Sequence, residues 1–115
     1  MSVAIYGIKS CDTMKKAMVW LDAHGIAYIF HDYKKEGVDR ARLLGWVREV
    51  GWAELINRSG TTFRKLPEAD KTDLTEEKAI QLMTDNPSMI RRPVLEAATL
   101  LIGFKPERYA EFFKG

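Results

Sequence analysis

The chain has 115 residues, of which 46% are hydrophobic and 30% charged, and its formal net charge at pH 7 is +2. A chain of this length can bury the core of one domain without disulfides or a metal. The near-neutral charge argues against nucleic acid or an anionic membrane surface as a partner. A single cysteine excludes a disulfide scaffold and fits a reducing compartment. Because no basic, apolar leader begins the chain and no apolar run approaches the roughly 20 residues that span a bilayer, we expect a cytoplasmic protein.

The first third of the chain predicts a strand, a helix and a second strand. Residues 3–6 are apolar and partly β-branched, as in a buried strand, and Gly7 ends them. From residue 12 onward the apolar residues recur with the period of a helix, at Met14, Ala17, Met18 and Leu21. Gly25 closes this helix, and residues 26–33 predict the second strand. Because the connections are short, the two strands should be parallel neighbours.

The middle of the chain predicts helices that are joined by polar turns. The expected segments are a charged turn at 34–37, a helix capped by Asp39 and ended by Gly51, a short helical piece at 52–56, a polar loop at 57–62, and a helix that begins at Thr75 and ends before Pro87. Together they form a helical insert at about residues 38–90.

The last part of the chain returns to strands. Residues 94–97 and 100–103 predict two strands joined by a tight connection, and Pro106 begins a final helix. The inward face of that helix should carry Tyr109, Phe112 and Phe113. The order is therefore β-α-β, a helical insert, and β-β-α, which we interpret as one α/β domain over residues 1–115.

Cys11, the only cysteine, stands where the first helix is predicted to begin. A helix N-terminus presents unpaired N–H groups and a positive dipole end, and both favour a thiolate over a thiol. The N–H groups of Asp12, Thr13 and Met14 would also form a cradle for an anion. A thiolate here could attack the sulfur of a mixed disulfide or an oxyanion such as arsenate. Because no second cysteine is present, another molecule must resolve the product.

Other cysteine chemistries do not fit the spacing. A Cys-x-x-Cys dithiol needs cysteine at position 14, which is Met14, and a phosphatase-like Cys-x5-Arg loop needs arginine at position 17, which is Ala17. One cysteine and two distant histidines offer no recognisable set of metal ligands. We therefore expect no metal and no bound cofactor.

Four segments together resemble the arsenate reductase-like family, which also includes the Spx-type regulators. They are Tyr-Gly-Ile-Lys-Ser-Cys-Asp-Thr-Met-Lys-Lys-Ala at 6–17, Phe-His-Asp-Tyr-Lys at 30–34, Gly-Thr-Thr-Phe-Arg-Lys-Leu at 60–66 and Ile-Arg-Arg-Pro-Val-Leu at 90–95. The resemblance covers essentially the whole chain and is greatest to the YffB branch. It implies a thioredoxin-like fold in which a central, mixed four-stranded sheet carries an inserted helical subdomain.

The resemblance also implies a set of site residues. The family's arsenate reductases place three basic residues around the oxyanion that their cysteine attacks. By motif, the cysteine is Cys11, one basic residue is Arg92, and another is Lys105, where those reductases have arginine. Lysine cannot hold an oxyanion with a planar, bidentate fork, which weighs against specificity for arsenate. The expected substrates are arsenate and glutathione mixed disulfides.

The remaining positions lie in two loops. The third basic residue matches Arg58, with Arg64 as the second candidate, and Pro93 is implied to be cis and to lie beside the cysteine. Residues expected to bind the substrate or its thiol are Ser10, Asp12, Thr13, Pro93 and Arg64.

Two functions follow from the resemblance. The first is a monomeric, glutathione-dependent thiol oxidoreductase, in which glutathione is the thiol co-substrate and glutaredoxin can clear a mixed disulfide. The alternative is a Spx-like regulator that binds RNA polymerase and has no enzymatic activity. The Cys-x-x-Cys switch of many such regulators is absent here, because position 14 is Met14.

Overall fold

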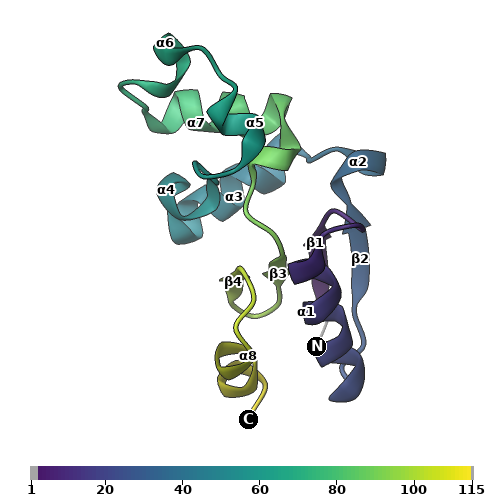
Figure 1. Ribbon diagram of the computed structural model, residues 1–115. Helices are drawn as coiled ribbons and strands as arrows, with labels where there is room; N and C mark the ends of the chain where they lie inside the picture. The colour runs from purple at the N-terminus through teal and green to yellow at the C-terminus, as the bar shows by residue number, and fades with distance from the viewer. Residues whose placement is uncertain (1–2, 115) are drawn as a thin grey trace. The chain divides into compact units, whose positions relative to one another are not determined.

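A computed structural model describes residues 3–114 of the protein (Figure 1). The chain forms two compact units, one from the segments up to Asp32 and from Arg92 onward, the other from Tyr33–Arg91. The predicted insert at about 38–90 falls within the second unit. That both units belong to one domain stays a prediction. Within the described residues, no helix combines the length and the apolar character that crossing a membrane requires.

The first unit is built on a mixed four-stranded sheet. Its strands are β1 (Ala4–Gly7), β2 (Ile29–Asp32), β3 (Val94–Glu96) and β4 (Leu100–Ile102), in the order β2-β1-β3-β4. As the β-α-β unit predicted, β1 and β2 are parallel, while β3 is antiparallel to both β1 and β4. The predicted fold class is therefore confirmed.

The second strand is shorter than its predicted range of 26–33. Gly25 adopts a φ of +68°, and Ile26 N–H donates to the Leu21 carbonyl at 3.0 Å, so Ile26 still belongs to the helix C-terminus. At the other end, Tyr33 already begins a helix. Ile26 and Tyr28 were included in the predicted strand because they are apolar, but they pack against the core without pairing in the sheet.

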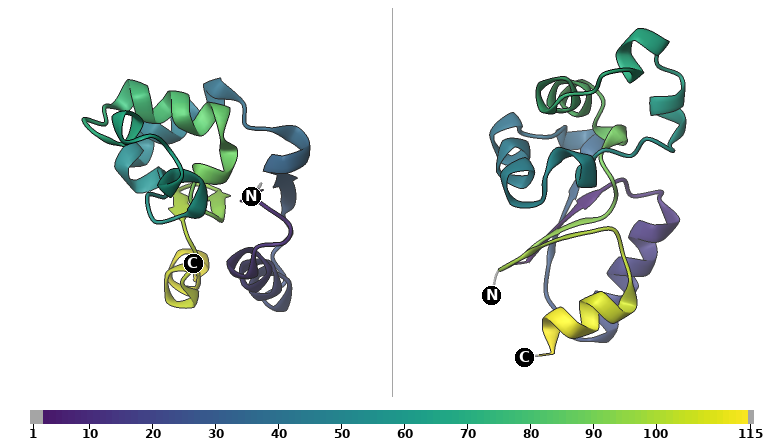
Figure 2. Two further views of the ribbon diagram at one scale, coloured as in Figure 1. Left: turned by 45° about the horizontal axis from the view of Figure 1, so that its top comes forward. Right: turned by 90° about the vertical axis from the view of Figure 1, so that its left-hand side faces the viewer.

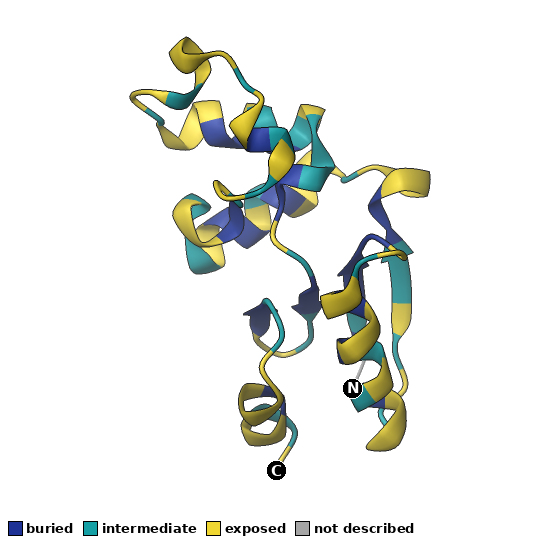
Figure 3. Ribbon diagram, in the orientation of Figure 1, coloured by how far each residue is buried: buried dark blue, intermediate teal, exposed yellow. Residues whose placement is uncertain are grey.

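Two helices cover one face of this sheet. These are α1 (Asp12–Ala23) and α8 (Pro106–Phe113), which lie on the same side of the strands in the right-hand view of Figure 2. The core between the helices and the sheet consists of Val3, Ile5, Met14, Ala17, Leu21, Leu95, Leu101 and Tyr109. Figure 3 shows the resulting pattern on α1, with buried positions toward the sheet and exposed positions away from it.

The aromatic residues of α8 face this core, but to different extents. Tyr109 is fully buried, whereas Phe112 and Phe113 are half-buried. The Tyr109 ring packs edge-on against Trp20 and Phe104, with centroid separations of 5.5 and 4.8 Å. Burial of the phenol raises the pKa of Tyr109. The predicted inward orientation is thus confirmed most clearly for Tyr109, and Phe112 and Phe113 are buried only in part.

The second unit is helical. Its elements are α2 (Tyr33–Glu36), α3 (Arg40–Val50), α4 (Trp52–Leu55), α5 (Thr61–Arg64), α6 (Glu68–Lys71), α7 (Glu76–Asp85) and the 3₁₀ turn η1 (Pro87–Met89). The predicted cap is confirmed, because Asp39 accepts from Arg42 N–H at 3.3 Å. Thr75, predicted as a helix start, is the N-cap of α7 and accepts from Lys78 N–H at 3.2 Å.

Three short helices differ from the expectation. The predicted turn at 34–37 contains α2, the predicted loop at 57–62 runs into α5, and α6 was not predicted. Each has four residues, which is too few to show a 3.6-residue period in the sequence. Phe63 is nevertheless buried, so α5 contributes to the core of the unit.

Candidate active site

Cys11 lies at the junction between β1 and α1, as its position in the sequence predicted. It is the N-cap of α1, with φ −78° and ψ 129°. Its N–H donates to the Ile8 carbonyl at 3.1 Å, and its own carbonyl accepts from Lys15 N–H at 3.0 Å. The residue is half-buried and packs against the edge of the core. The thiol is thus held in place while part of it remains accessible to solvent.

The surroundings of Cys11 favour the thiolate. Partial burial by itself acts to raise the pKa of the thiol, because it penalises the charged form. The backbone N–H of Met14, the guanidinium of Arg92 and the backbone N–H of Thr13 outweigh that effect, and the net result is a lowered pKa for Cys11. The Cys11 side chain forms no regular capping hydrogen bond. The N–H groups at the start of α1 thus favour the thiolate form of Cys11.

Arg92 begins the second of the two chain segments that form the first unit, and its side chain acts on the thiol of Cys11 in the first segment. It is half-buried, whereas the neighbouring Arg91 is exposed. Arg92 lies two residues before β3, the strand that pairs with β1, so the sheet brings its side chain toward the start of α1. Its guanidinium lowers the pKa of Cys11 both as a hydrogen-bond donor and as a positive charge. Of the two basic residues predicted in the first unit, Arg92 acts on the thiol and Lys105 is not among the groups that shift its pKa.

The peptide bond between Arg92 and Pro93 is cis, as the resemblance implied. Pro93 is buried, and its carbonyl accepts from Gly103 N–H at 2.9 Å, which ties the segment to the end of β4. Arg92 is thus attached to a fixed backbone. The predicted role of Pro93 in binding a thiol stays a prediction.

Lys105 occupies a different position. It is exposed at the N-cap of α8, with φ −136° and ψ 118°, and its side chain is not among the groups that shift the pKa of Cys11. Ser10, Asp12 and Thr13 surround Cys11 in the sequence and are exposed. All four residues belong to the first unit, and their parts in substrate binding stay predictions.

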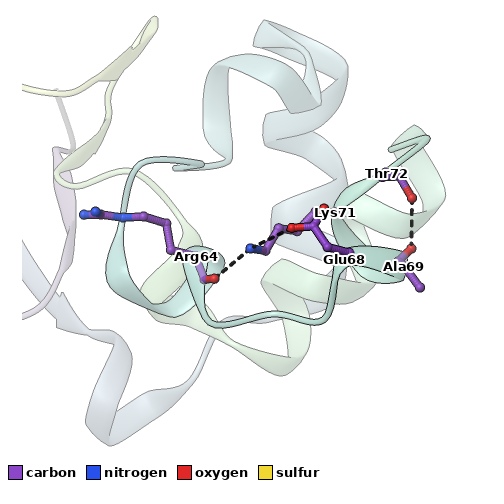
Figure 4. A network of polar contacts seen from close by, with 5 residues as sticks. All are labelled: Arg64, Glu68, Ala69, Lys71 and Thr72. Atoms are coloured by element: carbon purple, nitrogen blue, oxygen red, sulfur yellow. Dashed lines mark hydrogen bonds and ion pairs between the residues drawn. The ribbon is translucent and has the colours of Figure 1, made fainter.

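Arg58, in a loop, and Arg64, the last residue of α5, belong to the second unit, and each is exposed. The guanidinium carbon of Arg58 lies 5.3 Å from the centroid of the Trp52 ring. The Arg64 carbonyl accepts from Lys71 Nζ at 2.7 Å, while the Arg64 guanidinium extends away from that contact (Figure 4). Lys71 Nζ also lies 3.7 Å from Glu68 Oε1. Each arginine thus contacts a neighbour within its own unit. The predicted role of both residues toward Cys11 stays a prediction.

The potential metal ligands do not gather in the described part of the chain. Among residues 3–114, no three side chains of His, Cys, Asp or Glu form a group that could hold a metal ion. The chemistry that the site offers is that of one thiol with a lowered pKa, beside an arginine and the N-terminus of a helix.

Fold and site together define a thioredoxin-like α/β protein with a single cysteine at the start of its first helix. The chain belongs to the ArsC family, whose model matches residues 6–112. The family includes arsenate reductase-related proteins.

Individual proteins show the same relationship. A solved structure of a protein called YffB is 59% identical, with a TM-score of 0.92, and covers 96% of this chain and 97% of its own. The solution structure of an arsenate reductase (ArsC) related protein from Brucella melitensis is 55% identical, with a TM-score of 0.79, over 100% of this chain and 97% of its own. The resemblance drawn from the motifs is thereby confirmed.

More distant curated relatives also align along the chain. A protein from Haemophilus influenzae is 39% identical over 112 residues, which cover 96% of this chain and 98% of that protein. The global transcriptional regulator Spx of Lactiplantibacillus plantarum is 27% identical over 113 residues, which cover 96% of this chain and 85% of the regulator. The same fold is therefore shared by arsenate reductase-related proteins and by regulators of transcription.

Proposed function

We propose that this protein is a glutathione-dependent thiol oxidoreductase in which Cys11 is the nucleophile. One observation carries the proposal: backbone N–H groups and the Arg92 guanidinium converge on the half-buried sulfur and lower the pKa of Cys11 despite its burial. A cysteine that only packs in a core has a raised pKa, because burial in apolar surroundings disfavours the thiolate. The lowered pKa of Cys11 therefore sets it apart from such a cysteine.

The proposed reaction has two exchange steps. The Cys11 thiolate attacks the glutathione sulfur of a mixed disulfide, a Cys11–glutathione disulfide forms, and the substrate sulfur leaves as a thiolate that takes up a proton. A second glutathione, as its thiolate, then attacks the sulfur of the bound glutathione. Oxidised glutathione forms, and Cys11 departs as the thiolate. Over the cycle one mixed disulfide and one glutathione thiol become one substrate thiol and one oxidised glutathione, with no bound cofactor required.

The single cysteine of the chain supports an external second thiol. The sequence contains no other cysteine that could displace the adduct, and position 14, one helical turn along, is the fully buried Met14. Reduced glutathione or glutaredoxin supplies the missing sulfur in this proposal. Arg92, with Lys105 as the second cation, would receive the negative charge of glutathione or of an oxyanion substrate such as arsenate.

Mass spectrometry tests the exchange steps directly. Reduced protein incubated with oxidised glutathione should gain one glutathione per chain, and addition of excess reduced glutathione should return the original mass. A coupled assay that follows formation of oxidised glutathione should then show turnover with a mixed-disulfide substrate, and a parallel reaction with arsenate tests that second substrate. A protein that gains no glutathione, or that retains it permanently under reducing conditions, would contradict the proposed cycle.

A regulatory function is the alternative, because Spx regulators align over nearly the whole chain. In that case the protein would bind RNA polymerase and have no turnover. Capture of polymerase subunits from a lysate by the immobilised protein, together with an inactive coupled assay, would favour the regulator. Turnover without polymerase capture would favour the enzyme.

A further inference from the structure

Gly7 and Met14 contact each other across the turn that carries Cys11. Gly7 is the last residue of β1 and is buried, and Met14 lies in the first turn of α1 and is fully buried. A Cβ atom added at Gly7 would lie 2.6 Å from Met14 Sδ and 3.2 Å from Met14 Cε. The Met14 thioether therefore occupies the space that the side chain of any other residue at position 7 would need.

Met14 links the core to the thiol. Its side chain belongs to the core cluster that includes Ile5 and Leu95, and its backbone N–H is the main group that lowers the pKa of Cys11. The position of that N–H is consequently set by how deeply the side chain of the same residue packs. Cys11 N–H bonds to the Ile8 carbonyl at 3.1 Å, so the connection between β1 and α1 is short and closed, with little slack to absorb a shift.

We propose that Gly7 and Met14 are a positioning pair: the missing side chain at Gly7 lets Met14 seat the first turn of α1 against the end of β1, and this seating sets the reactivity of Cys11. The inference rests on the proposed function, since it assigns the pair a role in preparing the same nucleophile. Neither residue touches the substrate in this account. Their effect passes through the Met14 backbone to the sulfur.

Gly7→Ala is a narrow perturbation for testing this pair. Gly7 has no left-handed φ, so alanine fits its backbone conformation without strain. The added methyl group meets a side chain in a close-packed core, where small changes in volume are felt. Either the α1 turn moves away from β1, or the Met14 side chain finds another conformation and the turn stays.

The pH profile of Cys11 alkylation by iodoacetamide separates these outcomes. We expect Gly7→Ala to raise the pKa of Cys11 by at least about half a unit, which lowers the alkylation rate about threefold at a pH below both values. The double variant Gly7→Ala/Met14→Ala removes the clash and keeps the N–H of residue 14, but it also loses the side chain that anchors the turn, so its pKa should return only part of the way toward that of the wild type. Recovery of the pKa would show that the clash acts through the position of the turn, because both substitutions leave in place every group that acts on the sulfur.

Gly45→Ala is the matched control. Gly45 lies within α3 in the second unit, it has no left-handed φ, and a Cβ there would meet nothing within 4 Å. Its alkylation profile should equal that of the wild type. A Gly7→Ala profile that also equals the wild type would overturn the proposal, as would a double variant that folds by circular dichroism but keeps the full rise of the pKa.

Failure of the pair and failure of the proposed function give different results. If wild-type Cys11 has an ordinary pKa, the proposed nucleophile itself is refuted. If the wild-type pKa is lowered and Gly7→Ala leaves it unchanged, only the positioning role is refuted. Should Gly7→Ala not fold, the double variant decides: a folded protein with a lowered pKa for Cys11 supports the pair, and one with an ordinary pKa contradicts it.

Discussion

Cys11→Ser is expected to abolish thiol transfer and to leave the fold intact. Serine keeps a similar shape but is a far weaker nucleophile at neutral pH without an adjacent base, and it cannot form the disulfide on which the proposed cycle depends. Cys11 is half-buried at the margin of the core, so we expect the free energy of unfolding to change by less than about 1 kcal/mol. The coupled glutathione assay measures the first effect, and denaturant unfolding the second.

The wild-type protein supplies its own control for this variant. Because Cys11 is the only cysteine, alkylation with iodoacetamide modifies this one sulfur, and the alkylated protein should be as inactive as Cys11→Ser. Turnover by the serine variant at a rate near that of the wild type would refute the role of Cys11 as nucleophile.

Arg92→Met is expected to have the second-largest effect, a raised pKa for Cys11. Methionine retains much of the apolar stem of arginine but removes the hydrogen bond and the charge that lower the pKa of the thiol. With these interactions gone, the penalty from burial acts against a smaller opposing effect, so the pKa must rise. A rise of one unit would reduce the thiolate, and with it the alkylation rate below that pKa, about tenfold.

Arg91→Met is the matched control, because Arg91 is the neighbouring residue and is exposed. It removes the same charge from the chain but should leave the alkylation profile of Cys11 unchanged. Arg92→Lys should lie between the wild type and Arg92→Met, since lysine keeps the charge and loses the planar fork. Equal profiles for Arg91→Met and Arg92→Met would mean that the local contact of Arg92 has no effect on the thiol.

The local elements of this fold could be predicted because their signals are local. Asp39 and Thr75 bond to N–H groups three residues along the chain, and Gly25 and Gly51 adopt the positive φ that ends a helix. The position of Cys11 at a helix start followed in the same way from the residues on either side of it. Three of the four helices of four residues escaped prediction because one turn shows no period, whereas α4 falls within the predicted piece at 52–56.

The composition of the site depends on contacts that spacing does not reveal. Arg92 reaches Cys11 because β3 pairs with β1, and only the family resemblance indicated that arrangement in advance. The same reasoning named Lys105, which the structure leaves exposed at a helix start. The contact of Gly7 with Met14 was missed, since a glycine after a strand predicts only the end of that strand. Its close approach to the Met14 sulfur depends on how α1 packs onto the sheet.

The pH dependence of wild-type Cys11 alkylation tests the central claim most directly. Only the thiolate reacts, so the rate rises with pH and levels off above the pKa, and a lowered pKa moves this rise to lower pH. The N–H groups of α1 and Arg92 outweigh the effect of burial, so the midpoint should lie clearly below the value of about 8.5 for a free cysteine. A midpoint at or above that value would show that the start of α1 does not activate the sulfur, and it would contradict the account of this protein as a thiol oxidoreductase.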